Sequence, residues 1–356
     1  MLRREPTTLP VRRVSGERSG LTAGRQTPRV NTDELVAVSV MGQIAHPIGR
    51  STPYRIGYDG VPRVLPGTGG IVLNRRIGDL CVGLAGDHIE PGVALHNNNR
   101  EVTGPRDGPN NALITYACVG NVARVISGPC NGQLGLVSGK HGGINHVLVD
   151  FPTEVLLRLQ IGDRVQITSI GQGLRLLDHP RVEVLNCAPR LLARWGLRVV
   201  DGQLHVPVTH MVPARVMGSG LGKNTAWRGD YDIQLADRVT RERHRLGSLR
   251  FGDMVAITDA DTRRGPVFRH GRVTIGVIVH GDSTVSGHGP GVTPLLTGPT
   301  QLLRPVRDAG ANLAAIFAVR RLAVPTQRLT LAERDRRQRC VLREPPPSLA
   351  FSTGEA

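Results

Sequence analysis

Short runs of β-branched and aliphatic residues recur along the middle of the chain, and Gly, Pro and Asn separate them. Clear examples start at Glu34 (ELVAVSVMGQIA), Ala112 (ALITYACVGNVARVI), Arg164 (RVQITSIG), Asp253 (DMVAITDA) and Arg272 (RVTIGVIVHGD). Runs of this kind, bounded by turn residues, are typical of strands. We therefore predict a mainly β protein, a strand-rich α+β fold with a barrel-like or sandwich-like core and few helices.

A Gly-Asp dipeptide introduces three of the strand-like segments, at Gly78-Asp79, Gly162-Asp163 and Gly252-Asp253. Gly tolerates a positive φ and Asp hydrogen-bonds nearby backbone, so the pair suits a tight turn that leads into a strand. The recurrence indicates a core in two parts. The end of the run HVLVDFP, near Phe151-Pro152, predicts the boundary between them.

Both ends of the chain mix Arg, Pro, Ser and Gly without periodicity, so they have too little apolar surface to offset the entropy of ordering. Helical signals are confined to PRLLARWGL from Pro189 and RDAGANLAAIFAVRRL from Arg307. The predicted organisation is a disordered Arg-rich tail (residues 1–30), an N-terminal strand-rich domain (31–152), a C-terminal strand-rich domain with a closing helix (153–321) and a second disordered tail (322–356).

The formal net charge of +16 is concentrated in the two tails. Residues 1–30 contain seven Arg and two Glu, and residues 320–356 contain eight Arg and four acidic residues, which leaves +7 for the middle of the chain. Aromatic residues, on which bases would stack, make up only 3% of the chain. This argues against nucleic acid as a partner, apart from nonspecific contacts of the tails, and favours a small-molecule ligand.

The five cysteines form no CxxC pair and are odd in number: Cys81, Cys118, Cys130, Cys187 and Cys340. This pattern argues against a disulfide framework and against a thiolate zinc site. The Arg pairs near the N-terminus are not followed by an apolar stretch, and no run reaches the roughly 18 apolar residues of a membrane span. We therefore predict a cytoplasmic protein with reduced thiols and no membrane contact.

The segment HGDSTVSGHGPGV, from His280, places two histidines and an aspartate among four glycines. Glycines at this density indicate a sharp turn or a close approach of the backbone to a ligand. Imidazole and carboxylate are the ligands that Zn, Mn or Fe accept in a site without thiolates. With His88 of LAGDHIEPGVALHN, from Leu84, the predicted metal ligands are His88, His280, Asp282 and His288. The alternative for the segment at Leu84 is an Asx turn with an exposed histidine.

The segment SGKHGGINHVLVDF, from Ser138, surrounds Gly142 and Gly143 with Lys140, His141 and His146. On one straight strand the two histidines would face opposite sides, but a turn at the glycines would bring them together. Lys and His at a glycine turn can hold an anion. The alternative is a hairpin whose histidines are solvated.

The segment MGSGLGKNTAWRGDYDIQ, from Met217, has neither the spacing nor the Ser or Thr of a P-loop, and it lacks the dinucleotide-binding fingerprint. It does contain flexible glycines, including Gly220 and Gly222, followed by Asp230 and Asp232. Their spacing places both carboxylates on the same face of an extended segment, which suits a hard cation or general-base chemistry. The alternative is a charged surface turn.

The strings GDHIEPG, SGKHGGINHVLVDF, MGSGL with RGDYDIQ, LRFGDMVAI and HGDSTVSGHGPGV occur here in a fixed order. In these strings the chain resembles the uncharacterised domain of unknown function 4438 family, over roughly residues 33–305. The resemblance implies a strand-rich fold in two parts and a prokaryotic protein, but no activity or cofactor. The sequence departs from the family pattern in its Arg-rich tails and at Gly281, where Ser is expected.

The favoured hypothesis is a metal-assisted hydrolase or lyase that acts on a small polar or anionic substrate and uses a divalent metal ion (Zn, Mn or Fe). The predicted catalytic residues are Asp230 or Asp232 as general base and His141. The residues predicted to contact substrate are Lys140, Gly142, Gly143, His146, Gly220 and Gly222. Two alternatives stay open: a non-catalytic module that binds a small molecule or anion, and a homo-oligomeric assembly protein whose histidine loops line an interface.

Overall fold

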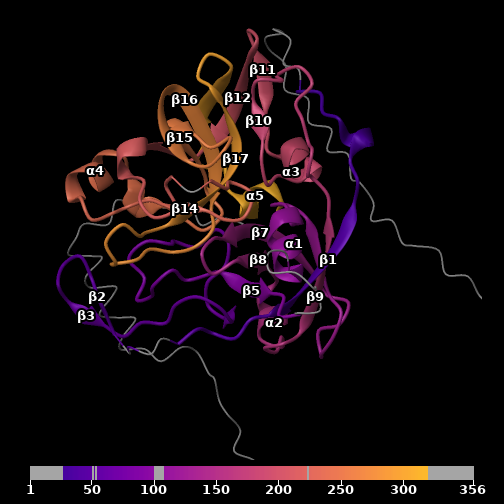
Figure 1. Ribbon diagram of the computed structural model, residues 1–356, viewed down its shortest axis with the longest axis vertical. Coiled ribbons are helices and arrows are strands. Elements are labelled where there is room, and N and C mark those ends of the chain that lie inside the picture. Colours follow the sequence, from indigo (N-terminus) through magenta and orange to yellow (C-terminus); the bar gives the residue numbers. More distant parts are fainter. Residues whose placement is uncertain (1–26, 50–51, 53, 100–107, 223, 320–356) are drawn as a thin grey trace, which may run out of the picture. The chain divides into compact units, whose positions relative to one another are not determined.

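The computed structural model describes residues 27–49, 52, 54–99, 108–222 and 224–319 (Figure 1). Strands predominate in these ranges and the helices are short, which confirms the predicted mainly β fold. The predicted tails, residues 1–30 and 322–356, lie outside the described residues apart from residues 27–30. Within the described part of the chain, no helix has the length and apolar character needed to cross a membrane.

Six antiparallel strands of the N-terminal half close into a barrel. They are hydrogen-bonded in the order β1 (Val38–Ile44), β9 (Arg164–Ser169), β6 (Val122–Val125), β7 (Leu134–His141), β8 (His146–Asp150) and β5 (Gly92–His96), and β5 pairs back to β1. The short strand β4 (Ile71–Val72) adds to β5. Alternate residues of β9 are buried, so Val165 and Ile167 join the apolar core inside the barrel.

Strand β9 lies beyond residue 152, where the sequence predicts a division into two domains. Its pairing with β1 and β6 closes the barrel, which therefore continues to Ser169. The division predicted at residue 152 therefore falls inside the barrel. Pairing between strands so far apart in sequence leaves no local signal from which this closure could be predicted.

The C-terminal half of the chain forms a second sheet, whose central strands are orange in Figure 1. Its order is β10 (Glu183–Val184), β17 (Gly291–Pro299), β16 (Val267–Ile278), β15 (Met254–Asp261) and β13 (His210–Pro213), and β14 (Tyr231–Asp232) also pairs with β17. Two smaller sheets are β11 (Arg198–Val200) with β12 (Gln203–Val208) and β18 (Leu303–Arg307), and β2 (Arg55–Ile56) with β3 (Pro62–Arg63). Val212, Ile257 and Ile278 belong to a second apolar core under this sheet.

The three Gly-Asp turns share one geometry. The carboxylates of Asp79, Asp163 and Asp253 each accept a hydrogen bond from the backbone N–H three residues earlier, at 2.8, 2.9 and 2.9 Å. The preceding glycines have φ of 94°, 89° and 80°, a region that favours glycine. The turn predicted from the repeated Gly-Asp dipeptide therefore forms at Asp79, Asp163 and Asp253.

The helices are α1 (Pro109–Tyr116), α2 (Thr153–Leu156), α3 (Pro189–Arg194), α4 (Arg238–Arg243) and α5 (Leu313–Ile316), with 3-10 turns η1 (Thr32–Glu34), η2 (Ala214–Val216) and η3 (Leu246–Ser248). Helix α3 begins at Pro189, as predicted. The helix predicted from Arg307 begins at Leu313, because β18 extends to Arg307 and the side chain of Asn312 caps the helix.

The run from Ala112 contains a helix where the sequence predicts a strand. Pro109 occupies the first turn of α1, and Leu113 and Ile114 are buried in the barrel core. Strand β6 begins only at Val122. Burial of one apolar face against the barrel thus outweighs the strand propensity of the β-branched residues.

Strands β7 and β17, one from each sheet, meet through Thr293. The backbone N–H of Lys140 donates to Oγ1 of Thr293 at 3.2 Å, and this hydroxyl donates to the carbonyl of Lys140 at 2.9 Å. The contact brings His141 at the end of β7 close to the start of β17 at Gly291. The polar loops identified in the sequence lie around this junction.

Candidate metal centre

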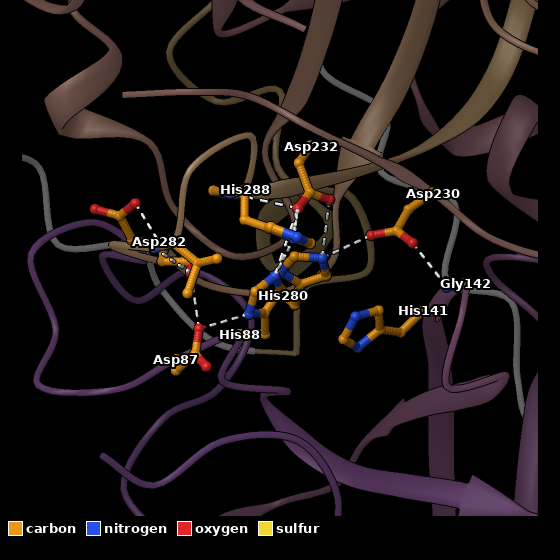
Figure 2. Close-up of polar contacts among 12 residues, drawn as sticks. Asp87, His88, His141, Gly142, Asp230, Asp232, His280, Asp282 and His288 are labelled. Carbon is orange, nitrogen blue, oxygen red and sulfur yellow. Dashed lines mark hydrogen bonds and ion pairs between the residues drawn. The ribbon is translucent and has the colours of Figure 1, made fainter. Parts of the chain in front are cut away.

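The four polar segments of the sequence converge in one cluster (Figure 2). The barrel contributes two histidines, one from the loop before β5 and one from the end of β7. The second sheet contributes two carboxylates from the start of β14 and two histidines from the connection between β16 and β17. These residues form two groups whose ligand atoms lie within 4.8 Å of one another: His88, Asp232 and His288, and His141, Asp230 and His280.

A buried carboxylate holds the imidazole of His141. Nδ1 of His141 donates to Oε1 of Glu90 at 2.6 Å, and Nδ1 of His146 lies 3.1 and 3.0 Å from the two oxygens of the same carboxylate. Burial alone would raise the pKa of Glu90, but the two histidines outweigh it and hold this pKa below its ordinary value. Because an ionised carboxylate only accepts hydrogen bonds, His141 carries a proton on Nδ1, and Nε2 is the ring nitrogen turned toward the cluster.

The imidazoles of His88 and His280 are oriented in the same way. Nδ1 of His88 lies 2.7 Å from Oδ1 of Asp87, and Nδ1 of His280 lies 3.0 Å from the carbonyl of Gly281. Both partners are acceptors, so each histidine carries a proton on Nδ1 and turns its Nε2 toward the cluster. Nε2 of His88 also lies 2.9 Å from Nδ1 of His288. His88 also has a left-handed backbone with φ of 58°, an uncommon conformation for a residue other than Gly that often occurs at functional sites.

Asp230 and Asp232 face Nε2 atoms of His88 and His280. Oδ2 of Asp230 lies 2.7 Å from Nε2 of His280, and Oδ1 of Asp232 lies 3.5 Å from the same nitrogen. Oδ2 of Asp232 lies 3.0 Å from Nδ1 of His288 and 3.5 Å from Nε2 of His88. The alternation of Asp230 and Asp232 along an extended segment thus points both carboxylates into the cluster.

One short contact in the cluster joins two acceptors. Nε2 of His280 and Oδ2 of Asp230 are both buried and neither has a hydrogen-bond partner. With the His280 proton on Nδ1, the 2.7 Å contact would place two lone pairs against each other. A cation between them, either a proton or a metal ion, resolves this contact.

The charges of the cluster also favour a cation, which is either a proton on His280 or a metal ion. Among the described residues, the ion pairs of Asp230 and Asp232 are all with histidines. Burial alone would lower the pKa of His280, but Asp230 and Asp232 outweigh it and raise this pKa well above its ordinary value. Buried carboxylates without a Lys or Arg partner, together with converging imidazoles, form the donor set that Zn, Mn or Fe prefers.

Glycines make room for the cluster. A Cβ atom on Gly291, which pairs with Asp232 across β14 and β17, would lie 2.0 Å from Oδ2 of Asp230 and 2.2 Å from Nε2 of His280. A Cβ atom on Gly289 would lie 1.9 Å from the carbonyl of Ile233. The glycine-rich sequence after His280 therefore reflects close approach of the backbone to the cluster.

A cavity of about 590 Å³ opens onto the cluster. Its wall includes the side chains of His88, His141, Asp230, Asp232 and His288, and the glycines Gly142, Gly143 and Gly220 that the sequence predicts as substrate contacts. The wall also carries two guanidinium groups, Arg55 paired with Asp87 and Arg63 paired with Asp59. Hydroxyl groups of Thr52, Thr68, Ser219 and Thr284 also line it.

Lys140 does not reach the cavity, contrary to the prediction that it holds a substrate anion. It is fully buried, and Nζ donates to Oδ1 of Asn186 at 2.7 Å and to the carbonyls of Trp227 and Thr115 at 2.8 and 3.1 Å. Successive side chains of a strand point to opposite faces, so the orientation of His141 toward the cluster turns Lys140 away.

Three other predicted contacts take different positions. Asp282 accepts hydrogen bonds from the backbone N–H groups of Ser283 at 2.8 Å and Gly83 at 3.4 Å, and it points away from the imidazoles in Figure 2. Its role is to stabilise the loop rather than to bind metal. His146 is buried behind Glu90, and Gly222 is exposed and does not line the cavity.

Sequence reasoning missed Glu90, and it considered Asp87 only as part of the segment from Leu84, either a loop that contacts metal or substrate or an Asx turn. Asp87 accepts from Nδ1 of His88, from Oγ of Ser283 at 2.7 Å and from Arg55. Residues 85–88 form bends and His88 has a positive φ, so strand alternation offered no signal for Glu90.

Comparison with known proteins agrees with this fold. The family model described as domain of unknown function (DUF4438), N-terminal, matches residues 54–193, and the model of its C-terminal domain matches residues 194–317. The solved structure "Crystal structure of TM1086" is 41% identical in sequence, with a TM-score of 0.76, and the match covers 83% of this chain and 99% of that chain. No curated protein matches the chain.

Proposed function

Because the chain belongs to the DUF4438 family, whose description assigns no activity, we propose from the site itself that the protein is a metal-dependent enzyme. It is a hydrolase or lyase for a small anionic substrate that binds in the cavity above the cluster. A bound divalent ion would supply an activated water and polarise a carbonyl or phosphoryl oxygen.

The observation that carries the proposal is the set of fixed imidazole protons. His88, His141 and His280 each donate from Nδ1 to an acceptor, so three Nε2 atoms are turned toward two carboxylates. Ligating histidines in metalloenzymes are held in this way by carboxylates or backbone carbonyls. A solvated or purely structural cluster has no need to orient each ring.

The cavity supports an anionic substrate. Arg55 and Arg63 place two guanidinium groups in the cavity wall, with side chains that are 26% and 29% exposed. Guanidinium groups bind carboxylates and phosphates through paired hydrogen bonds. Tyr54 and Val64 on the same wall offer apolar surface for the rest of the substrate.

The predicted general bases are better placed as ligands. Oδ1 of Asp230 accepts from the backbone N–H of Gly142 at 2.7 Å, and the other three oxygens of Asp230 and Asp232 face histidines. In this arrangement Asp230 and Asp232 would hold the metal ion, and Gly142 and Gly143 would let a substrate approach the backbone.

The test combines metal analysis with turnover by the full-length protein. We expect stoichiometric Zn, Mn or Fe in the purified protein, and metal-dependent depletion of members of a panel of small carboxylate-bearing amides, esters and lactones and of phosphate monoesters. Mass spectrometry would follow each compound before and after treatment with a chelator, with Asp232→Asn as the inactive control. Protein without any bound metal would refute the proposal. Bound metal with binding but no turnover of any compound would favour the anion-binding module.

A further inference from the structure

We propose that the cluster holds two divalent metal ions bridged by the carboxylate of Asp232. The ligands of the first ion, besides Asp232, are His88 and His288, and those of the second are His141, Asp230 and His280. This inference rests on the proposed metal-dependent function and adds the number of ions and the role of one carboxylate.

The first set has the spacing of ligands around a common ion. Nε2 of His88 and Nδ1 of His288 lie 2.9 Å apart, and Oδ2 of Asp232 lies 3.5 and 3.0 Å from them. Ligand atoms bound at about 2.1 Å to one ion lie roughly 3 to 3.5 Å from one another. His288 is the most exposed ligand, with a side chain that is 32% exposed, so this ion would be the more accessible one.

The second set is buried behind the first. Nε2 of His280 lies 2.7 Å from Oδ2 of Asp230, and the rings of His280 and His141 are 4.2 Å apart between centroids. The side chains of His280 and Asp230 are 0% and 4% exposed. The short contact between Nε2 of His280 and Oδ2 of Asp230 lies in this set, and a metal ion bound by both atoms would replace it.

Asp232 belongs to both sets. Oδ2 faces His88 and His288, whereas Oδ1 lies 3.5 Å from Nε2 of His280. A carboxylate whose two oxygens face separate ligand sets bridges ions in two-metal sites, where the ions are about 3.5 to 4 Å apart. Four imidazoles and two carboxylates also exceed the four ligands of a single tetrahedral ion.

Two ions suit the substrate class proposed above. In two-metal sites the ions stabilise both the attacking and the leaving oxygen of a displacement reaction. The carboxylates of Asp230 and Asp232 touch the proposed ions directly, whereas Asp87 and Glu90 act through His88 and His141. Two divalent ions with open coordination positions would therefore bind an anionic group of the substrate directly, with Arg55 and Arg63 in the same cavity wall.

The decisive experiment titrates metal-free, full-length protein with Mn²⁺ and records both stoichiometry and the electron paramagnetic resonance spectrum. We expect two Mn²⁺ per chain with the spectrum of an exchange-coupled pair. The variant His288→Ala should retain one tightly bound Mn²⁺ with the spectrum of an isolated ion, because the buried set is intact. His270→Ala, whose side chain is 90% exposed, is the matched control and should behave as the wild type.

Each other outcome is informative. One Mn²⁺ per wild-type chain, or two that are not coupled, would overturn the dinuclear centre and leave a one-metal enzyme standing. No bound Mn²⁺ would overturn the dinuclear centre, whereas the metal-dependent function is overturned only if the purified protein also contains no Zn, Mn or Fe. The wild-type spectrum tests the bridge directly, so the conclusion does not depend on the variant, whose fold is checked by circular dichroism.

Discussion

The carboxylate of Glu90 accepts the Nδ1 proton of His141 at 2.6 Å. The same carboxylate faces His146 and accepts from the backbone N–H of Gly69 at 2.6 Å, so its position is fixed on several sides. Because Glu90 is only 1% exposed and does not reach the cavity, it acts on the cluster through the histidine that it orients.

Replacing Glu90 with Gln should weaken metal binding by about 10- to 100-fold, the usual effect of losing a carboxylate behind a ligating histidine. Gln still fills the space but can present an amide group to His141, which favours the wrong tautomer. Calorimetric titration with Zn²⁺ measures the affinity. Glu34→Gln is the control, since that side chain is 60% exposed. Equal affinities for Glu90→Gln and wild type would contradict this role.

Adding a methyl group at Gly291 should disrupt the second ligand set. In Gly291→Ala the new Cβ would overlap Oδ2 of Asp230 and Nε2 of His280, so we expect at least a tenfold loss of metal affinity and about 1–3 kcal/mol of destabilisation. Gly247→Ala is the matched control, because no atom lies within 4 Å of its Cβ position. Metal titration and urea unfolding of both variants check the prediction, and similar behaviour of the two would be evidence against it.

Lys140 should matter for stability and not for the metal or the substrate. Lys140→Met leaves the buried oxygens of Asn186, Trp227 and Thr115 without their donor, so the free energy of unfolding should fall by about 2–4 kcal/mol. Arg124→Met, at an exposed position of β6, should change it by less than about 0.5 kcal/mol. The Mn²⁺ stoichiometry of Lys140→Met should equal that of the wild type. Loss of anion binding in a stable variant would restore the substrate role predicted from the sequence.

The burial of His210, which lies outside the cluster, predicts that the stability of the fold depends on pH. It is buried, its Nδ1 lies 2.8 Å from Oγ1 of Thr209, and its Nε2 lies 3.0 Å from Oγ of Ser248. Burial, and then the charges of Arg307 and Arg250, lower its pKa to about 4. The unfolded chain binds a proton near pH 6.5 and the folded chain only near pH 4, so stability is complete above about pH 6.5 and is lost as the pH falls toward 4.

The variant His210→Gln lacks this contribution. The stability difference between wild type and variant should therefore shrink by about 2 kcal/mol between pH 7 and about pH 4.5, as measured by urea unfolding. Asp253 lies 3.9 Å from Nδ1 of His210, but it pairs with Arg250 and so does not hold the imidazolium. A difference that does not vary with pH would show that His210 titrates normally.

Much of the site followed from composition and spacing. His88, His280, Asp230 and Asp232 were identified because ionisable residues beside glycines follow strand-like runs, and they all lie in the cluster. Lys140 was assigned to the same place as His141, although adjacent residues of a strand cannot share a face. Strand alternation alone predicts that the side chains of Lys140 and His141 point to opposite faces of β7.

Other features depended on contacts between distant segments. Glu90 precedes a Pro-Gly turn and looks like a surface residue until Gly69 and His146 enclose it. Asp282 has the residue type and position of a ligand, but hydrogen bonds to backbone amides turn it away. The closure of the barrel by β9 likewise requires a pairing that no local pattern encodes.

His88 and His288 touch at 2.9 Å although 200 residues separate them. During synthesis the barrel half of the chain leaves the ribosome long before the last ligand is made. A nascent chain therefore has an incomplete set of imidazoles, and under the proposed function full metal affinity would appear only when β17 has docked beside β7. Metal capture would then report completion of the fold, and a truncated chain would be unable to compete for metal with the finished protein.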